Sequence, residues 1–233
     1  DVPAFAYSAG EFCAGGVVCD RGALVVGISA SGQTAEVAEA LQKAAAFGAR
    51  TASLTGDPDS PLARAGGTLL SLPCSLPGGL PPVTHFVLGY VLLALVAVDW
   101  GLRQKTITPL FGRMAVKLCA TLPDKLRLIL KSGSELDALA AYLTVYDRLM
   151  FVGQNIDLAA AGAMAGVWSR TLGVPVETVP ASELRHTLLP TVDSHTALVT
   201  LISSRELTEK TCAALQLAAI RGAGPVACPV ESL

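Results

Sequence analysis

Six consecutive residues have the types and spacing of an anion-binding turn: Ser29, Ala30, Ser31, Gly32, Gln33 and Thr34. They follow a short apolar run and open a helical pattern, and the free backbone N–H groups at a helix start bind anions. Gly32 lets the backbone approach a ligand closely, and the three hydroxyls can donate to phosphate oxygens. No lysine accompanies the turn, unlike the nucleotide-binding Walker pattern. The turn therefore fits a phosphate monoester, and the competing interpretation is an ordinary serine-rich helix cap.

The elements around this turn must hold it in place. Leu24–Ile28 is a short apolar run, typical of a strand that is buried on both faces. Thr34–Phe47 has helical spacing of its apolar residues, and Gly48 suits a helix C-terminus. Thr51–Leu54 and Thr68–Leu72 are two further expected strands. The turn should thus join a core strand to a helix.

The second half of the chain has the same alternation. We expect strands at Arg148–Val152, Ala197–Ile202 and Val226–Pro229, and helices at Leu158–Leu172 and Leu207–Arg221. Strands that alternate with helices form a parallel sheet covered by helices on both faces. The sequence predicts an α/β protein.

An internal repeat accounts for this similarity between the halves. Shifted by 174 positions, Ala23–Ala49 matches Ala197–Ala223 at 13 of 27 residues. We expect two α/β subdomains, residues 1–105 and 134–233, joined by a helical connector, residues 106–133. The first copy lacks a counterpart of the strand Arg148–Val152 and of the helix after it. Either the natural protein is longer or the first copy is truncated; we favour the former, because an open sheet edge is a liability.

The repeat also predicts how many phosphate sites the chain carries. In the second copy the turn reads Ser203, Ser204, Arg205, Glu206, Leu207 and Thr208. Glu206 puts a carboxylate where the glycine and the anion would lie. We expect one phosphate site per chain, in the first copy.

Composition excludes several classes of protein. The net charge is −2 and no run of Lys or Arg occurs, so a nucleic-acid partner is not expected. The six cysteines form no CxxC or metal-ligand pattern, which indicates reduced thiols, no metal and no cofactor.

The charge-free stretch Val83–Val98 is shorter than the ~20 residues of a membrane span. We interpret it as a buried helix at a subunit interface, and without a signal peptide we expect a cytoplasmic protein.

These residues resemble a known family. Val25–Thr34 is similar to the strand and S-x-S-G-x-T loop that bind sugar phosphate in SIS (sugar isomerase) domains, above all in the double-SIS isomerase domain of glucosamine-6-phosphate synthase and its relatives. Ala9–Phe12 resembles that family's A-S-E-F segment, and Ala181–His186 resembles its G-E-L-K-H segment. The resemblance implies a homodimer, with Ser29, Ser31, Gln33 and Thr34 around the phosphate. It also implies that His186 is an acid/base for ring opening, near the subunit interface.

One departure puts isomerase activity in doubt. The family places a glutamate base sixteen residues before the histidine, and this chain has Arg170 there. A cation cannot abstract the proton that moves in aldose–ketose isomerisation. The family's C-terminal catalytic lysine segment also has no counterpart before Leu233. Glu183 could replace the base, or it could share with Glu11 a structural contact at a helix N-terminus.

Three other residues are weaker candidates. Thr84 and His85 lie at a helix start in a region that lines the sugar pocket in the family. Arg170 could bind a carboxylate or a second phosphate, or it could end a solvated helix.

Two functions stay open. The first is a sugar-phosphate isomerase or related aldose/ketose-phosphate enzyme, of isomerase or deaminase type, and the second is a sugar-phosphate sensor without turnover. We favour the enzyme.

Overall fold

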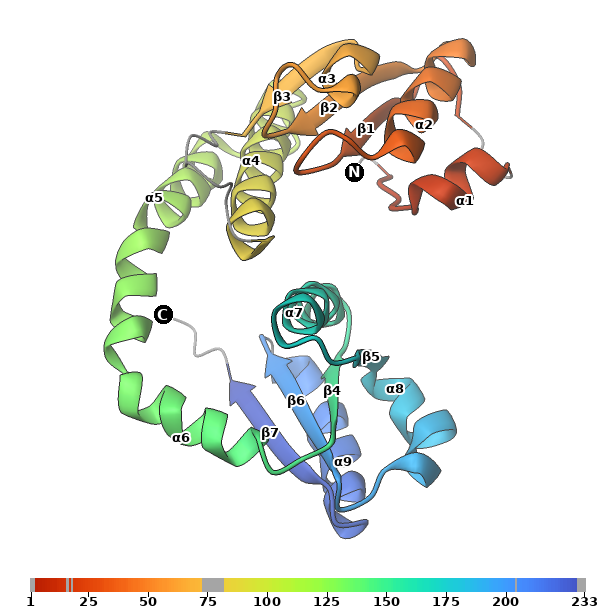
Figure 1. Cartoon of the computed structure of the whole chain (residues 1–233). Coiled ribbons are helices and arrows are strands. Elements are labelled where there is room, and N and C mark those ends of the chain that lie inside the picture. The colour runs from red at the N-terminus through yellow and green to blue at the C-terminus, as the bar shows by residue number, and fades with distance from the viewer. Residues whose placement is uncertain (1–2, 16, 18, 73–81, 204, 230–233) are drawn as a thin grey trace. The chain divides into compact units, whose positions relative to one another are not determined.

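The computed structural model describes residues 3–15, 17, 19–72, 82–203 and 205–229 (Figure 1). The chain forms two compact units, Asp1–Leu122 and Pro123–Leu233. We call them unit 1 and unit 2 and describe each by itself.

Unit 1 is built on a parallel sheet with the order β1-β2-β3. Its strands are β1 (Leu24–Ile28), β2 (Arg50–Thr55) and β3 (Thr68–Ser71). Leu24 of β1 lies opposite Arg50 of β2, and the register continues to Ile28 opposite Leu54. All three strands end at the same edge of the sheet because they run parallel. The turn after β1 therefore lies beside residues 55–62, which run from the last residue of β2 into α3. We call these residues the segment after β2.

Helices lie on both faces of this sheet. α2 (Ala35–Ala46) covers the face that carries Gly27, where an added Cβ would lie 2.9 Å from Leu41 of α2. α3 (Pro61–Ala65) and the short α1 (Ala9–Ala14) both pack against α2. On the opposite face, Gly89 of α4 (Pro82–Arg103) lies close to Leu54 of β2.

The α4 helix differs from the sequence prediction. It has 22 residues, and Val83–Arg103 is long and apolar enough to cross a membrane by length and composition, so the predicted length of sixteen residues is wrong. It is also not a buried helix within this chain, because only 6% of its apolar window is buried. The physical reason is that the helix meets the sheet of unit 1 where Gly89 lies against Leu54, while Phe86 and Tyr90 stay exposed. After α4 comes α5 (Pro109–Lys131), which contains Pro123.

Unit 2 is built on a second parallel sheet with the order β5-β4-β6-β7. Its elements in chain order are α6 (Gly133–Leu143), β4 (Arg148–Gly153), α7 (Ile156–Leu172), β5 (Val176–Pro180), α8 (Ala181–Glu183), the π-helical turn η1 (Leu184–Leu188), the 3-10 turn η2 (Leu189–Thr191), β6 (Thr196–Ile202), α9 (Arg205–Ile220) and β7 (Gly224–Pro229).

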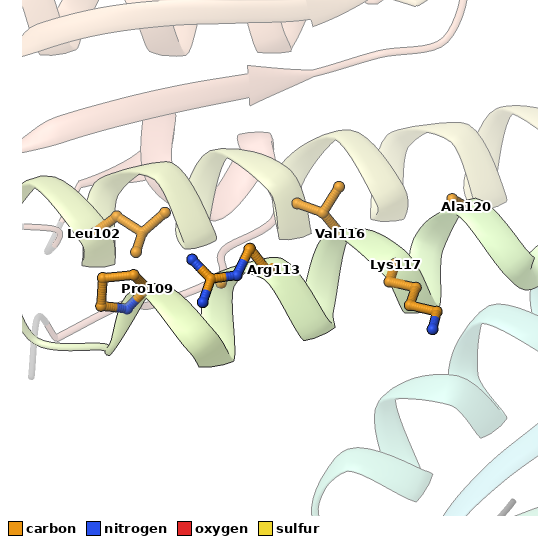
Figure 2. Close-up of a pocket in the computed structure, with 7 residues that line it drawn as sticks. Leu102, Pro109, Arg113, Val116, Lys117 and Ala120 are labelled. Atoms are coloured by element: carbon orange, nitrogen blue, oxygen red, sulfur yellow. The ribbon is translucent and has the colours of Figure 1, made fainter.

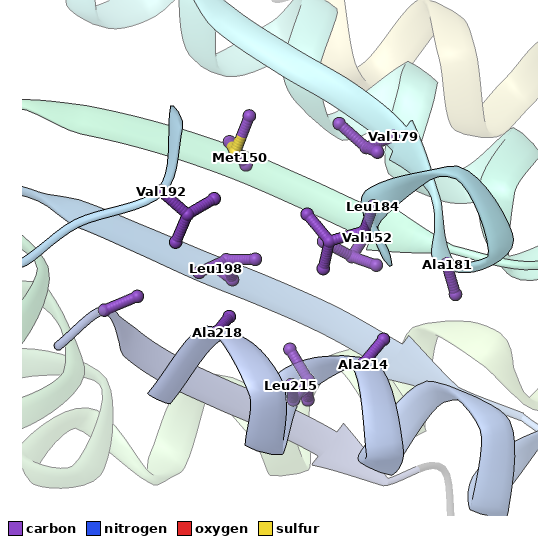
Figure 3. Close-up of a cluster of buried hydrophobic side chains, with 11 residues drawn as sticks. Met150, Val152, Val179, Ala181, Leu184, Val192, Leu198, Ala214, Leu215 and Ala218 are labelled. Atoms are coloured by element: carbon purple, nitrogen blue, oxygen red, sulfur yellow. The ribbon is translucent and has the colours of Figure 1, made fainter. Parts of the chain in front are cut away.

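The core of unit 2 shows why successive residues on its central strands are apolar. Met150, Val152 and Leu198 point to the face covered by α9, where Leu215 and Ala218 meet them (Figure 3). The residues between them point to the other face. There Phe151 packs edge-on against Trp168 of α7, with ring centroids 5.5 Å apart. Both faces are apolar, which produces the continuous hydrophobic runs of the sequence.

The predicted α/β class with parallel sheets is confirmed. The repeat has partial support, because β1-α2-β2 and β6-α9-β7 are both parallel pairs around a helix. Their registers differ by one residue, since Leu198 faces Pro225 where the 174-residue shift would put Gly224. Within the described residues β1 has no strand on its outer edge, whereas β6 has β4 there. The duplication itself stays a prediction.

Candidate phosphate-binding site

The turn after β1, residues 29–34, is open to solvent, and we call it the cradle. Ala30, Ser31, Gln33 and Thr34 are exposed, and α2 begins directly after them. Ser29 and Gly32 are buried and hold the turn to the sheet. The exposed edge of the cradle is therefore free to meet a ligand.

The backbone of the cradle presents several free donors. Gly32 N donates to Ser29 O at 3.1 Å, and Gln33 N donates to Ser31 Oγ at 3.3 Å. In the part of the chain that the structure describes, the amides without an acceptor here are those of Ala30, Ser31, Thr34, Ala35 and Glu36. The last two belong to the first turn of α2, whose dipole adds positive character. A turn of this kind can bind an oxyanion without a cationic side chain.

The hydroxyls of the cradle are not used as a helix cap. Thr34 occupies the N-cap position of α2, yet its side chain makes no cap hydrogen bond. Its Oγ1 instead lies 3.0 Å from Ser29 Oγ. Ser31 Oγ accepts from the Gln33 amide and keeps its own proton to donate. This arrangement disfavours the interpretation as an ordinary serine-rich cap.

The structure gives a physical reason why residue 32 is a glycine, and the sequence alone did not reveal it. Its φ is +65°, a conformation that L side chains rarely adopt. A Cβ there would also lie 2.4 Å from Ser60 Cβ and 2.7 Å from Thr55 Oγ1. The sequence alone predicts that this glycine allows close approach of a ligand. The structure shows close approach of the segment after β2.

Sequence reasoning missed the residues of that segment. Asp57 Oδ2 accepts from Gln33 Nε2 at 3.4 Å, so the Gln33 amide group points toward a carboxylate of the protein. Thr55 and Ser60 are fully buried beneath the cradle. Their sequence, around Asp-Pro-Asp-Ser, reads only as a turn. No local signal links it to a loop about 25 residues earlier.

The turn of unit 2 that corresponds to the cradle donates to a carboxylate of the protein. Ser203 follows β6, and its amide donates to Asp157 Oδ2 at 3.1 Å. Asp157 lies in the first turn of α7 and is only 5% exposed. The protein's own carboxylate thus occupies a donor at this turn. Ser204 lies outside the described residues, as does the side chain of Glu206, so the predicted role of Glu206 stays a prediction.

The predicted catalytic residues lie in unit 2, whereas the cradle lies in unit 1. His186 is exposed in the π-helical turn η1, and Glu183 is exposed just before it. Buried Leu184 fixes this segment to the core. Arg170 is exposed in the last turn of α7, where a cation interacts favourably with the helix dipole. Their predicted action on a ligand of the cradle stays a prediction.

Thr84 and His85 belong to unit 1. Both are half-buried in the first turn of α4. One turn further on, Gly89 lies against Leu54, whose carbonyl accepts from the Ser29 amide at 3.0 Å. The start of α4 is therefore anchored to the strand that holds the cradle. The role of Thr84 and His85 in the sugar pocket stays a prediction.

A cavity of unit 1 lies elsewhere, between α4 and α5 (Figure 2). Its volume is about 620 Å³. Its lining is mostly apolar and includes two cationic side chains; the lining residues are Leu102, Pro109, Gly112, Arg113, Val116, Lys117 and Ala120. None belongs to the cradle, so this cavity is not the candidate phosphate site.

Comparison with known proteins identifies the region around the cradle. Residues 1–98 match the SIS domain family. This region is therefore similar to a SIS domain. The match includes the cradle, β1 to β3 and most of α4.

Relatives and solved structures extend the likeness beyond the SIS domain. Glutamine–fructose-6-phosphate aminotransferase (isomerizing) of Symbiobacterium thermophilum is 28% identical over 204 residues, which cover 88% of this chain and 34% of the relative. The C-terminal domain of glucosamine-fructose-6-phosphate aminotransferase from Francisella tularensis superposes with a TM-score of 0.79 at 23% identity, covering 96% of this chain and 64% of that chain.

A third match is glucosamine-6-phosphate deaminase from Thermotoga maritima, with a TM-score of 0.73 at 18% identity, covering 96% of this chain and 66% of that chain. The chain spans about a third of the length of the curated relatives it matches. At these identities the solved structures establish the shared fold, and the SIS domain match covers the cradle.

Proposed function

We propose that the cradle binds the phosphate group of a sugar phosphate. The observation that supports this most is the set of backbone amides at the start of α2 that have no acceptor among the described residues, beside the Ser31 hydroxyl, which keeps its proton to donate. Such donors suit a compact dianion. The match to the SIS domain and the sugar-phosphate names of the relatives give the same substrate class.

Affinity for fructose 6-phosphate tests this proposal. Ser31→Ala removes a hydroxyl that would donate to a charged group, and such a bond is worth about 1.5–3 kcal/mol. Titration calorimetry should therefore show affinity weakened roughly tenfold or more. Ser71→Ala, which changes an exposed serine on β3 of the same unit, is the matched control and should bind like the wild type. Equal affinity of the two variants would contradict the proposal.

We further propose that the chain belongs to an enzyme of the isomerase or deaminase type, with His186 as the acid/base and Glu183 as the proton-transferring base. The names of the relatives and the exposed position of His186 support this. The exposed Arg170 at a helix end supports the second candidate, a cytoplasmic sensor that binds sugar phosphate without turnover.

Deuterium exchange separates these two candidates. Proton transfer between adjacent carbons would introduce deuterium from D₂O into the bound sugar phosphate, which NMR detects. His186→Ala should abolish exchange and leave binding intact. His195→Ala, at an exposed histidine paired with Asp147, should retain both exchange and binding. Binding without any exchange in the wild type would favour the sensor.

We also propose that the chain forms a homodimer through α4. Apolar Val83, Phe86 and Tyr90 are exposed on a helix that unit 1 leaves mostly uncovered. Tyr90→Glu should yield monomers in sedimentation analysis. The matched change Phe47→Glu, at the exposed C-cap of α2, should leave the dimer intact.

A further inference from the structure

Two carbonyl groups of the cradle accept hydrogen bonds from the segment after β2. Ala30 O accepts from Gly56 N at 3.0 Å, and Gly32 O accepts from Leu62 N at 3.1 Å. Both donors come from residues that are distant in sequence from the cradle. These bonds fix the direction of the peptide groups in the turn.

The direction of a carbonyl determines the direction of the next amide. In a planar trans peptide, the C=O of one residue and the N–H of the following residue point to opposite sides. With Ala30 O held toward the segment after β2, the Ser31 N–H must point away from it. Ser31 is exposed, so its free amide faces solvent, where a phosphate would lie.

Two buried hydroxyls hold that segment in shape. Thr55 Oγ1 accepts from Asp57 N at 3.2 Å and reaches Ala30 O at 3.4 Å. Ser60 Oγ donates to Asp57 O at 2.7 Å and accepts from Ala63 N at 3.2 Å, which starts α3 and so places Leu62 N. Thr55 and Ser60 are both 0% exposed.

We propose that Thr55 and Ser60 are positioning residues of the phosphate site. They touch no ligand. They keep the carbonyls of the cradle on the protein side, and so keep the Ser31 amide directed at the phosphate. This inference rests on the proposed phosphate-binding function of the cradle. It predicts that removing either hydroxyl weakens ligand affinity, beyond any loss of folding stability.

A set of threonine variants of the full chain tests this. Thr55→Val removes the hydroxyl, and Thr55→Ser retains it. Thr51→Val is the matched control, because Thr51 Oγ1 accepts from Gly67 N at 2.9 Å at the other end of β2. The affinity for fructose 6-phosphate is measured at a temperature at which circular dichroism shows each variant to be folded. We expect affinity at least fivefold weaker for Thr55→Val, and within twofold of wild type for Thr55→Ser and Thr51→Val.

Ser60→Ala gives a second test if Thr55→Val does not fold, with an expected loss of at least threefold. Wild-type affinity in Thr55→Val, or in Ser60→Ala, would overturn the positioning role. An equal loss in Thr51→Val would also overturn it, because the effect would then be one of general stability. If Ser31→Ala weakens binding while these variants do not, only the positioning role fails. If the wild type does not bind, the proposed function fails and this inference with it.

Discussion

The substitution Gly32→Ala tests the packing of the cradle most sharply. Two separate costs arise at this position. The backbone is in the left-handed region, at φ +65°, where an L residue costs roughly 1–2 kcal/mol. The added Cβ would also lie 2.4 Å from Ser60 Cβ, and overpacking of a buried site costs about 1–3 kcal/mol. We expect unit 1 to lose about 2–5 kcal/mol of unfolding free energy.

Urea unfolding measures this loss in each unit separately. Unit 1 carries Trp100 and unit 2 carries Trp168, so variants with a single tryptophan report on one unit at a time. Gly173→Ala is the matched control, because Gly173 has φ +70° and nothing within 4 Å of an added Cβ. It should lose only the backbone cost, roughly 1–2 kcal/mol in unit 2.

A double variant checks the cause. Combining Gly32→Ala with Ser60→Gly removes the Ser60 side chain, which crowds the added Cβ most closely, and leaves Thr55 Oγ1 in place. The pair should therefore lose less stability than the two single changes added together. The reasoning is refuted if Gly32→Ala costs no more than Gly173→Ala, or if the two changes are additive. The same crowding makes Gly32→Glu a poor probe of charge at the cradle, since any side chain there disturbs the fold.

Three further outcomes are expected in unit 2. Gly153→Ala should destabilise unit 2 by about 1–3 kcal/mol in urea unfolding, because an added Cβ would lie 2.6 Å from the Asp157 carbonyl oxygen. Phe151→Ala should cost about 3–5 kcal/mol in the same assay, since Phe151 is only 1% exposed. The pKa of Asp193 is lowered by hydrogen bonds from the His195 amide and a threonine hydroxyl. A lowered folded pKa stabilises the fold above the unfolded value of about 4, and this stability is lost as pH falls through the folded pKa, so Asp193→Asn should flatten the acid side of the melting temperature against pH.

Local patterns predicted the strands and most helices well. The apolar run Leu24–Ile28 is β1 as observed, and Thr68–Leu72 differs from β3 only at its last residue. The predicted burial of β1 on both faces is wrong, because Leu24 and Ile28 are exposed and β1 is an edge strand within the described residues. The expectation holds for β6, which has strands on both sides and is buried almost throughout. The position of the cradle followed from the order of strand and helix, since a turn between a parallel strand and the next helix lies at the carboxyl edge of the sheet.

Contacts between distant segments could not be predicted in this way. The role of Gly32 depends on Ser60, 28 residues later, and the two meet only because β1 and β2 are parallel neighbours. The buried carboxylate of Asp157 at the Ser203 amide likewise joins two strands' ends. The sequence analysis also did not predict that α4 is exposed in this chain. The absence of charges from a helix indicates burial, but it does not show which surface covers the helix.

Amide shifts of the isotopically labelled chain test the central claim most directly. Addition of fructose 6-phosphate should shift the backbone signals of Ala30, Ser31 and Ala35 in a saturable way and leave that of Ser203 in place. Shifts at Ser203 with none in the cradle, or no saturable shift at all, would contradict the assignment of this turn as the phosphate site.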